Sequence, residues 1–222
     1  MADPTTGEAH RIREYFNEAS WRPSGGREML VAERRRLVEQ LVRATLPPFS
    51  QLTVCDVGCG RGSDLERWRA LGVAEERLFG TELIDERVQA ARRALPRASI
   101  APVEGYEIPF PDDSFNLVSA SLVLSTIRDR SGRAALLAEM SRVTRAGGLL
   151  AIYDFRVRKP WNRNVVAMSG SELAAALGPP DAEIRLGPFL PLLDPALKLP
   201  GGLRGPTIGL LPRTHRLWVW KA

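Results

Sequence analysis

Apolar residues between positions 53 and 155 follow two alternating periods. Short apolar runs with the length of buried strands are separated by segments in which apolar residues recur every three or four positions, as on one face of a helix. Strands are predicted at 53–57, 77–83, 98–102, 115–120 and 149–155, and helices at 63–71, 85–95 and 131–144. With 222 residues, this alternation predicts one α/β domain with a core of ample size.

The two ends of the chain have different patterns. Helical spacing predicts helices at 7–20 and 27–46, so residues 1–48 are expected to form an N-terminal helical cap on a core at 49–222. Near the other end we expect a helix at 169–177 and strands at 182–186 and 214–221. Residues 188–212 between them are rich in Pro, Gly and Leu and lack a strong period. Such long irregular segments are commonly functional, and we expect a lid that gives the site an apolar wall; completion of the core or a dimer interface is the alternative.

The most informative stretch is 53–65. An apolar run reaches Asp56, glycines follow at 58, 60 and 62, and a helical pattern then begins. Glycine allows a tight turn and lets a ligand approach the main chain, and the free N–H groups of the next helix face the same place. This strand–turn–helix therefore predicts a site for a nucleotide-type cofactor.

The glycine spacing argues against a dinucleotide. The dinucleotide fingerprint would place its third glycine at Ser63. Glu82 ends the second predicted strand about twenty residues after the glycines, where an acid can accept both ribose hydroxyls. This acid supports a nucleoside ligand without separating the two cofactor classes.

Three segments resemble one family. Asp-Val-Gly-Cys-Gly-Arg-Gly at 56–62 resembles motif I of class I S-adenosylmethionine-dependent methyltransferases. Residues 103–118, Val-Glu-Gly-Tyr-Glu-Ile-Pro-Phe-Pro-Asp-Asp-Ser-Phe-Asn-Leu-Val, are similar to a stretch of small-molecule methyltransferases such as the quinone-biosynthesis enzymes. The Gly-Gly pair at 147–148 before a strand resembles a later family segment. The resemblance spans 54–155.

This resemblance implies a fold, a cofactor and a binding site. The fold would be a doubly wound seven-stranded, mostly parallel sheet, Rossmann-like, of order 3-2-1-4-5-7-6, with helices on both faces. The cofactor would be S-adenosyl-L-methionine, with S-adenosyl-L-homocysteine as product. Asp56 would hold the methionine ammonium, Glu82 the ribose, and Leu83 would flank the adenine. The full implied set is Asp56, Gly58, Gly60, Glu82, Leu83, Gly105, Tyr106 and Ser121.

The catalytic residue stays unknown at this stage. Methyl transfer is an in-line displacement that mainly requires alignment of the reacting groups, and no metal-ligand cluster is visible. Family members often carry Leu-His-His where this chain has Leu-Ser-Thr at 124–126, so no histidine base is offered there. Tyr153, Asp154 and His10 are weak candidates for a general base, while His215 in the last strand is expected to be structural.

Composition and charge limit the classes of partner that we expect for this protein. The net charge of +5 raises the possibility of nucleic acid, but the basic residues are scattered and are not interleaved with aromatic residues, so nucleic acid is unlikely as a partner. No apolar run reaches ~18 residues and no secretory signal is visible, so we expect a cytoplasmic protein without a membrane segment. Cys55 and Cys59 suggest neither a disulfide framework nor a zinc site.

The sequence therefore predicts a methyltransferase that acts on a small hydrophobic or aromatic acceptor, as a monomer or homodimer. An RNA methyltransferase and an NAD-dependent oxidoreductase remain as alternatives.

Overall fold

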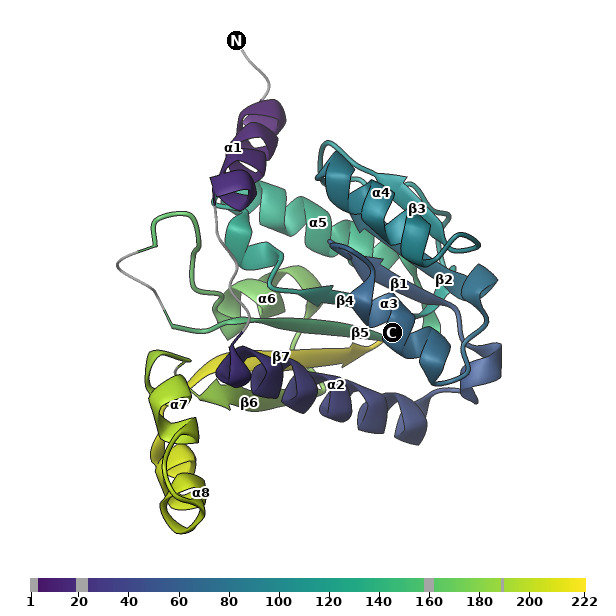
Figure 1. The fold of residues 1–222 in the computed structure, drawn as a ribbon. Helices are drawn as coiled ribbons and strands as arrows, with labels where there is room; N and C mark the ends of the chain where they lie inside the picture. The colour runs from purple at the N-terminus through teal and green to yellow at the C-terminus, as the bar shows by residue number, and fades with distance from the viewer. Residues whose placement is uncertain (1–3, 19–23, 158–161, 189) are drawn as a thin grey trace.

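The computed structural model describes residues 4–18, 24–157, 162–188 and 190–222. Its centre is a seven-stranded sheet of order β3-β2-β1-β4-β5-β7-β6 (Figure 1). The strands are β1 (Val54–Val57), β2 (Leu78–Glu82), β3 (Ser99–Pro102), β4 (Phe115–Ser121), β5 (Thr144–Phe155), β6 (Ala182–Pro188) and β7 (Arg213–Lys221). β7 alone runs antiparallel to its neighbours, between β5 and β6. The predicted fold class and strand order are confirmed.

Helices cover both faces of the sheet. The helices are α1 (Pro4–Glu18), α2 (Gly25–Thr45), α3 (Ser63–Ala70), α4 (Asp85–Ala94), α5 (Arg130–Val143), α6 (Gly170–Leu177), α7 (Leu190–Leu197) and α8 (Gly201–Leu210). Alternate strand residues point to opposite faces. Val54 and Leu117 pack with α2, α3 and α4, whereas Cys55 and Val118 pack with α5 and α6. Four of the five parallel strands, β1, β2, β4 and β5, are largely buried on both faces, which explains their near-continuous apolar runs.

The segment 188–212 corrects the sequence prediction. It was expected to lack regular structure, but it contains α7 and α8, which extend away from the sheet beyond β6 (Figure 1). Leu193 and Ala196 of α7 are buried, and α7 packs beside α2. By contrast, Leu203 and Leu210 of α8 are 60% and 87% exposed. Phe189, which belongs to the same predicted segment, lies outside the described residues.

Within the described ranges, no helix combines the length and the apolar character that crossing a bilayer requires.

Candidate functional site

The turn after β1 has the backbone that its glycines allow. Gly58, Gly60 and Gly62 have φ of 68°, 59° and 88°, in the left-handed region that costs other residues energy. The amide of Cys59 donates to the carbonyl of Thr81, which holds the turn against β2. A side chain at position 58 would also collide with Val123, whose Cγ2 would lie 2.5 Å from the added Cβ. The turn therefore requires glycine at position 58 for two independent reasons.

Glu82 is buried at the end of β2, with 5% of its surface exposed. Its Oε2 accepts a hydrogen bond from the amide of Gly60 at 2.8 Å, and its Oε1 accepts from the amides of Leu83 and Ile84 at 2.9 Å each. A carboxylate offers about four lone-pair positions. Three protein donors thus fix this side chain and leave capacity for a ligand donor.

Asp56 also lies at the turn but is buried beside β4. Its Oδ1 accepts from the hydroxyl of Ser119 at 2.8 Å. Burial, together with the nearby carboxylate of Asp64, raises the pKa of Asp56 to about 7. Asp64, at the start of α3, is in turn paired with Arg34 and Arg35 of α2, at 2.7 and 2.6 Å. The α2 helix is thereby joined to the glycine turn by ion pairs.

A cavity of about 680 Å³ lies at the carboxyl ends of the strands, a usual place for ligands in open α/β sheets. Its volume is within the range of small-molecule sites. Of the residues predicted to bind the cofactor, six line this cavity: Gly58, Glu82, Leu83, Gly105, Tyr106 and Ser121. Asp56, a buried residue of β1, and Gly60 of the turn do not line it.

The first helix covers one end of this cavity, which we call the β2 end. Glu8, Ile12, Tyr15 and Phe16 of α1 line it. Glu8 pairs with Arg11 at 2.9 Å and accepts from the amide of Arg128. In addition, Arg87 of α4 lies 4.2 Å from the ring centroid of Phe16. The structure thus places the rings of Tyr15 and Phe16 at the cavity.

The other end, which we call the β5 end, is formed by β5, β7 and the start of α2. It is lined by Arg27, Leu30, Val31, Arg34, Tyr153, Phe155, Val157, Asn162, Val165, Pro191, Thr214 and His215. The rings of Tyr153 and His215 are stacked, 5.2 Å apart with 3° between their planes. Pro191 is the residue by which the segment 188–212 reaches the described wall. Sequence reasoning missed Arg27 and Arg34, because only tertiary packing brings α2 to this end.

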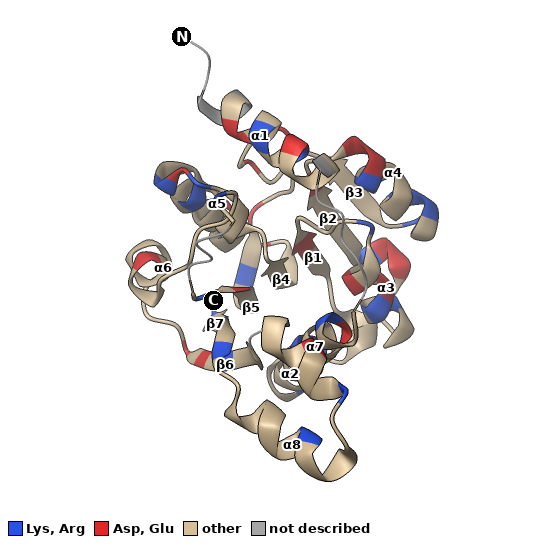
Figure 2. Cartoon of the chain, turned by 60° about the vertical axis from the view of Figure 1, so that its left-hand side comes forward, with Lys and Arg blue, Asp and Glu red and all other residues tan. Residues whose placement is uncertain are grey.

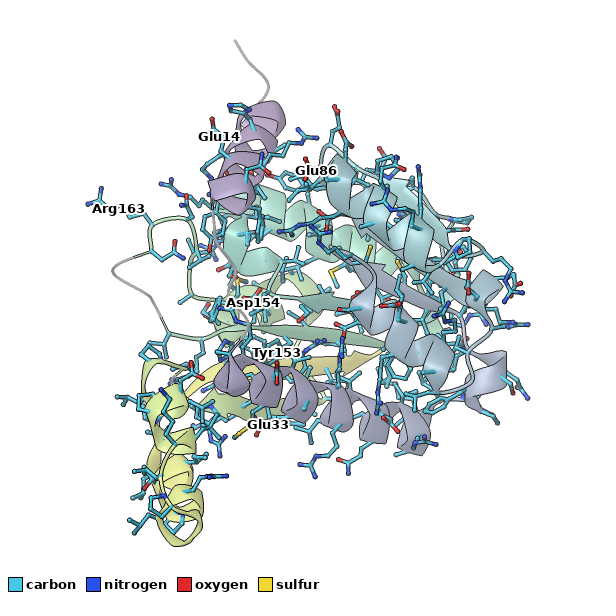
Figure 3. All side chains as sticks on the ribbon, viewed as in Figure 1. Glu14, Glu33, Glu86, Tyr153, Asp154 and Arg163 are labelled. Carbon is cyan, nitrogen blue, oxygen red and sulfur yellow. The ribbon has the colours of Figure 1, made fainter. Side chains whose placement is uncertain are left out.

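The structure places the three candidate bases in different surroundings. Burial raises the pKa of the Tyr153 hydroxyl well above its usual range, so it is protonated at neutral pH. Asp154 is adjacent on β5 (Figure 3), but its carboxylate accepts from the amides of Ser125 and Phe155, and it does not line the cavity. His10 is on the solvent side of α1, with 72% of its side chain exposed, next to Glu14.

Ser125 presents an unsatisfied hydroxyl at the cavity. The residue is fully buried, and its Oγ has no hydrogen-bond partner among the described residues. A buried hydroxyl without a partner costs about 1–3 kcal/mol, so such groups normally find one. A polar ligand atom in the cavity would satisfy it. The described residues contain no cluster of three or more side chains suited to a metal ion.

Comparison with known proteins identifies the domain. Residues 55–152 match the methyltransferase domain family. The chain contains a class I methyltransferase domain. It is 35% identical over 113 residues to a ubiquinone/menaquinone biosynthesis C-methyltransferase of Neisseria meningitidis. It is 29% identical over 174 residues to the malonyl-[acyl-carrier protein] O-methyltransferase of Serratia marcescens.

These alignments cover only part of each protein. They span 48% and 77% of this chain, and 44% and 60% of the two relatives. Among solved structures, the geranyl diphosphate C-methyltransferase of Streptomyces coelicolor, with S-adenosyl-L-homocysteine bound, superposes over 99% of both chains with a TM-score of 0.64. At 16% identity this likeness establishes the fold of the domain.

Proposed function

We propose that this chain binds S-adenosyl-L-methionine, transfers its methyl group to a small apolar or aromatic acceptor, and releases S-adenosyl-L-homocysteine. One observation carries the proposal. The glycine turn and Glu82 open into the same cavity of about 680 Å³ as the aromatic wall of Tyr153, Phe155 and His215. A single space thus combines an end suited to a nucleoside with an end walled by aromatic rings.

The β2 end fits the cofactor. Glu82 is held by three amides with acceptor capacity to spare for a ribose hydroxyl. Leu83, Gly105 and Tyr106 supply apolar and main-chain contacts for the adenine. Asp56 is buried and does not line the cavity, so it would act on the ammonium group through water. Ser125 offers a further hydrogen bond.

The chemistry asks the protein mainly for alignment. When bound, S-adenosyl-L-methionine supplies a methyl group activated by its sulfonium. The walls of the β5 end would hold the acceptor in line with that group, and effective alignment can supply several kcal/mol of a barrier. No general base is assigned, since Tyr153 is protonated and Asp154 and His10 do not line the cavity.

The sheet order and the charge distribution favour this function over the alternatives. The dinucleotide-binding fold has the order 3-2-1-4-5-6, whereas here an antiparallel β7 lies between β5 and β6. An RNA enzyme would be expected to present a continuous basic surface. Figure 2 instead shows both acidic and basic residues on each of the helices α3 and α4.

Calorimetry tests the cofactor assignment. Titration with S-adenosyl-L-homocysteine should give saturable binding, and titration with NAD or NADP should give none. Incubation with the methyl-labelled cofactor and cell extract should then label a small molecule. Binding of NAD with no binding of S-adenosyl-L-homocysteine would contradict the proposal, and label in RNA would select the alternative acceptor.

Four further features stay proposals. Residues 1–48 act as a cap on the core at 49–222, supported by the α1 and α2 side chains that line the cavity. The segment 188–212 acts as a lid, supported by Pro191, its one lining residue in the described part of the segment. A cytoplasmic location is supported by the two buried free thiols, Cys55 and Cys59. A monomer or a homodimer is expected, and sedimentation equilibrium distinguishes the two.

A further inference from the structure

Charged residues are unevenly divided between the two ends of the cavity. Among the described residues that line it, the carboxylates all come from α1, β2 and the loop after β3: Glu8, Glu82, Glu104 and Glu107, and Arg87 of α4 lines the same end. The charged residues of the β5 end are Arg27 and Arg34, both from α2. No carboxylate from the described part of the chain lines that end.

The carboxylates at the β2 end complement the positive charges of the proposed cofactor. The cofactor carries a sulfonium and an ammonium, so carboxylates are expected where it binds. The same reasoning applied to the β5 end predicts a ligand of opposite charge. An anion there would meet guanidinium groups and no nearby carboxylate on the wall.

The two arginines have different surroundings. Arg34 is paired with Asp64 at 2.7 Å and lies 5.6 Å from the ring centroid of Tyr153, so its charge is largely compensated. Arg27 is in the first turn of α2, beside the apolar Leu30 and Val31 of the same wall. The nearby carboxylate of Asp194 accepts from the amide of Gly26 and does not line the cavity. Arg27 also interacts within the protein, and its guanidinium has five donors with which to bind protein and ligand together.

We infer that the methyl acceptor carries an anionic group, of the carboxylate class, on its apolar or aromatic body, and that Arg27 is the residue that selects it. The inference rests on the proposed function, because it assigns the β5 end to the acceptor. Arginine binds a carboxylate through two parallel hydrogen bonds. The apolar residues Leu30 and Val31, three and four positions along α2, lower the local dielectric and thereby strengthen this contact.

A matched pair of probes separates charge from shape. 2-Naphthoate and 2-naphthamide have the same aromatic body and nearly the same outline, but only the first is an anion at pH 7. Each is titrated by calorimetry into the protein saturated with S-adenosyl-L-homocysteine. The wild type should bind the acid about tenfold or more tightly than the amide, as charge-assisted hydrogen bonds allow.

Variants assign the effect to Arg27. Arg27→Gln should bring the acid-to-amide ratio close to one and leave the affinity for the amide unchanged. Arg27→Lys should retain part of the preference, because the charge remains and the two-pronged geometry is lost. Arg163→Gln is the control: its side chain points away from the molecule (Figure 3) and does not line the cavity. It should keep the wild-type ratio.

Three results would overturn the inference: a wild type that binds both probes equally, one that binds neither at millimolar concentration, and an Arg27→Gln variant that keeps the wild-type ratio. Thermal unfolding shows whether each variant is folded, and Arg27→Lys stands in if Arg27→Gln is not. The affinity for S-adenosyl-L-homocysteine is measured separately. If S-adenosyl-L-homocysteine does not bind, the proposed function is contradicted. The ratio of the two probe affinities decides the inference, and it can also be measured on the protein without S-adenosyl-L-homocysteine.

Discussion

The amide of Gly60 donates a hydrogen bond of 2.8 Å to Oε2 of Glu82, and this contact joins the turn after β1 to the end of β2. Two residues that the sequence assigns separately to the cofactor site are therefore one unit. A change at Glu82 should therefore alter both the affinity for the cofactor and the stability of the turn.

Glu82→Gln should weaken binding of S-adenosyl-L-homocysteine about tenfold or more, because charge-assisted hydrogen bonds contribute roughly 1.5–3 kcal/mol each. Glu82→Ala should in addition lower the Tm, because it leaves the amides of Gly60, Leu83 and Ile84 without their acceptor. Calorimetry and thermal unfolding measure the two effects.

The matched control is Glu86→Ala. Glu86 is exposed on the next helix and points outward (Figure 3), so both quantities should stay at the wild-type value. If Glu82→Gln binds S-adenosyl-L-homocysteine with unchanged affinity, Glu82 does not hold the ribose.

Gly58→Ala should destabilise the protein more than Gly60→Ala. Both residues have positive φ, which costs an alanine roughly 1–2 kcal/mol. Only at Gly58 would the added Cβ also collide with Val123, whereas at Gly60 it meets no atom within 4 Å. The Tm of the two variants decides this, and Val123→Ala should partly rescue Gly58→Ala. Equal losses, or no rescue, would contradict the steric argument.

The open space at Gly60 gives a separate expectation. Gly60→Val should reduce cofactor binding while the protein still unfolds cooperatively, because the added side chain would enter space that the protein itself leaves open. A variant that fails to fold would instead assign this glycine to the backbone of the turn.

Asp56 should make stability fall as the pH rises towards neutrality. Its pKa is raised from 3.8 to about 7 in the folded state by burial and by Asp64. Between these values the folded state binds more protons than the unfolded state, so the free energy of unfolding decreases with pH. Asp56→Asn removes this pH-dependent contribution to the free energy of unfolding. The difference in unfolding free energy between the variant and the wild type should therefore shift in favour of the variant from pH 4 to pH 7 and level off above.

The same carboxylate links binding to pH. If Asp56 holds the ammonium of the cofactor, it must ionise to do so, and affinity for S-adenosyl-L-homocysteine should rise from pH 6 to pH 8 in the wild type. Calorimetry in two buffers of different ionisation enthalpy would show the released proton. The same pH profile in Asp56→Asn would assign the proton to another group.

Ser125→Ala should leave the Tm unchanged or raise it, since its hydroxyl has no partner among the described residues and is costly to bury. Affinity for S-adenosyl-L-homocysteine should nevertheless fall if the bound cofactor satisfies that hydroxyl. Ser119→Ala is the contrasting variant: it removes the hydrogen bond to Asp56 and should lower the Tm. A loss of stability in Ser125→Ala with unchanged affinity would contradict this role.

The strand–turn–helix at 53–65 and the acid at position 82 could be read from sequence because each depends on local rules. A glycine is required where φ is positive, as at Gly58, and an acid at the end of a strand lies at the ligand edge of a parallel sheet. The strand order followed from the resemblance to the family, since period and length alone do not specify which strands pair.

The interior of the site could not be read in this way. Tyr153 and His215 are 62 positions apart and stack only because β7 inserts antiparallel beside β5. Pro195 and the glycines of 201–209 argue locally against helices, yet α7 forms, and its buried Leu193 and Ala196 pack in the region beside α2. Packing outweighs propensity there.

By itself, then, the sequence determined the family, the fold and the glycine turn with its acid, because these follow from residue types at short spacing. Only the tertiary structure decided that Asp56 is buried against Ser119 and does not line the cavity, that the Ser125 hydroxyl has no partner among the described residues, and that α2 brings Arg27 to the β5 end of the cavity. Burial and charge at those positions depend on neighbours that are distant in the chain, and no local pattern encodes them.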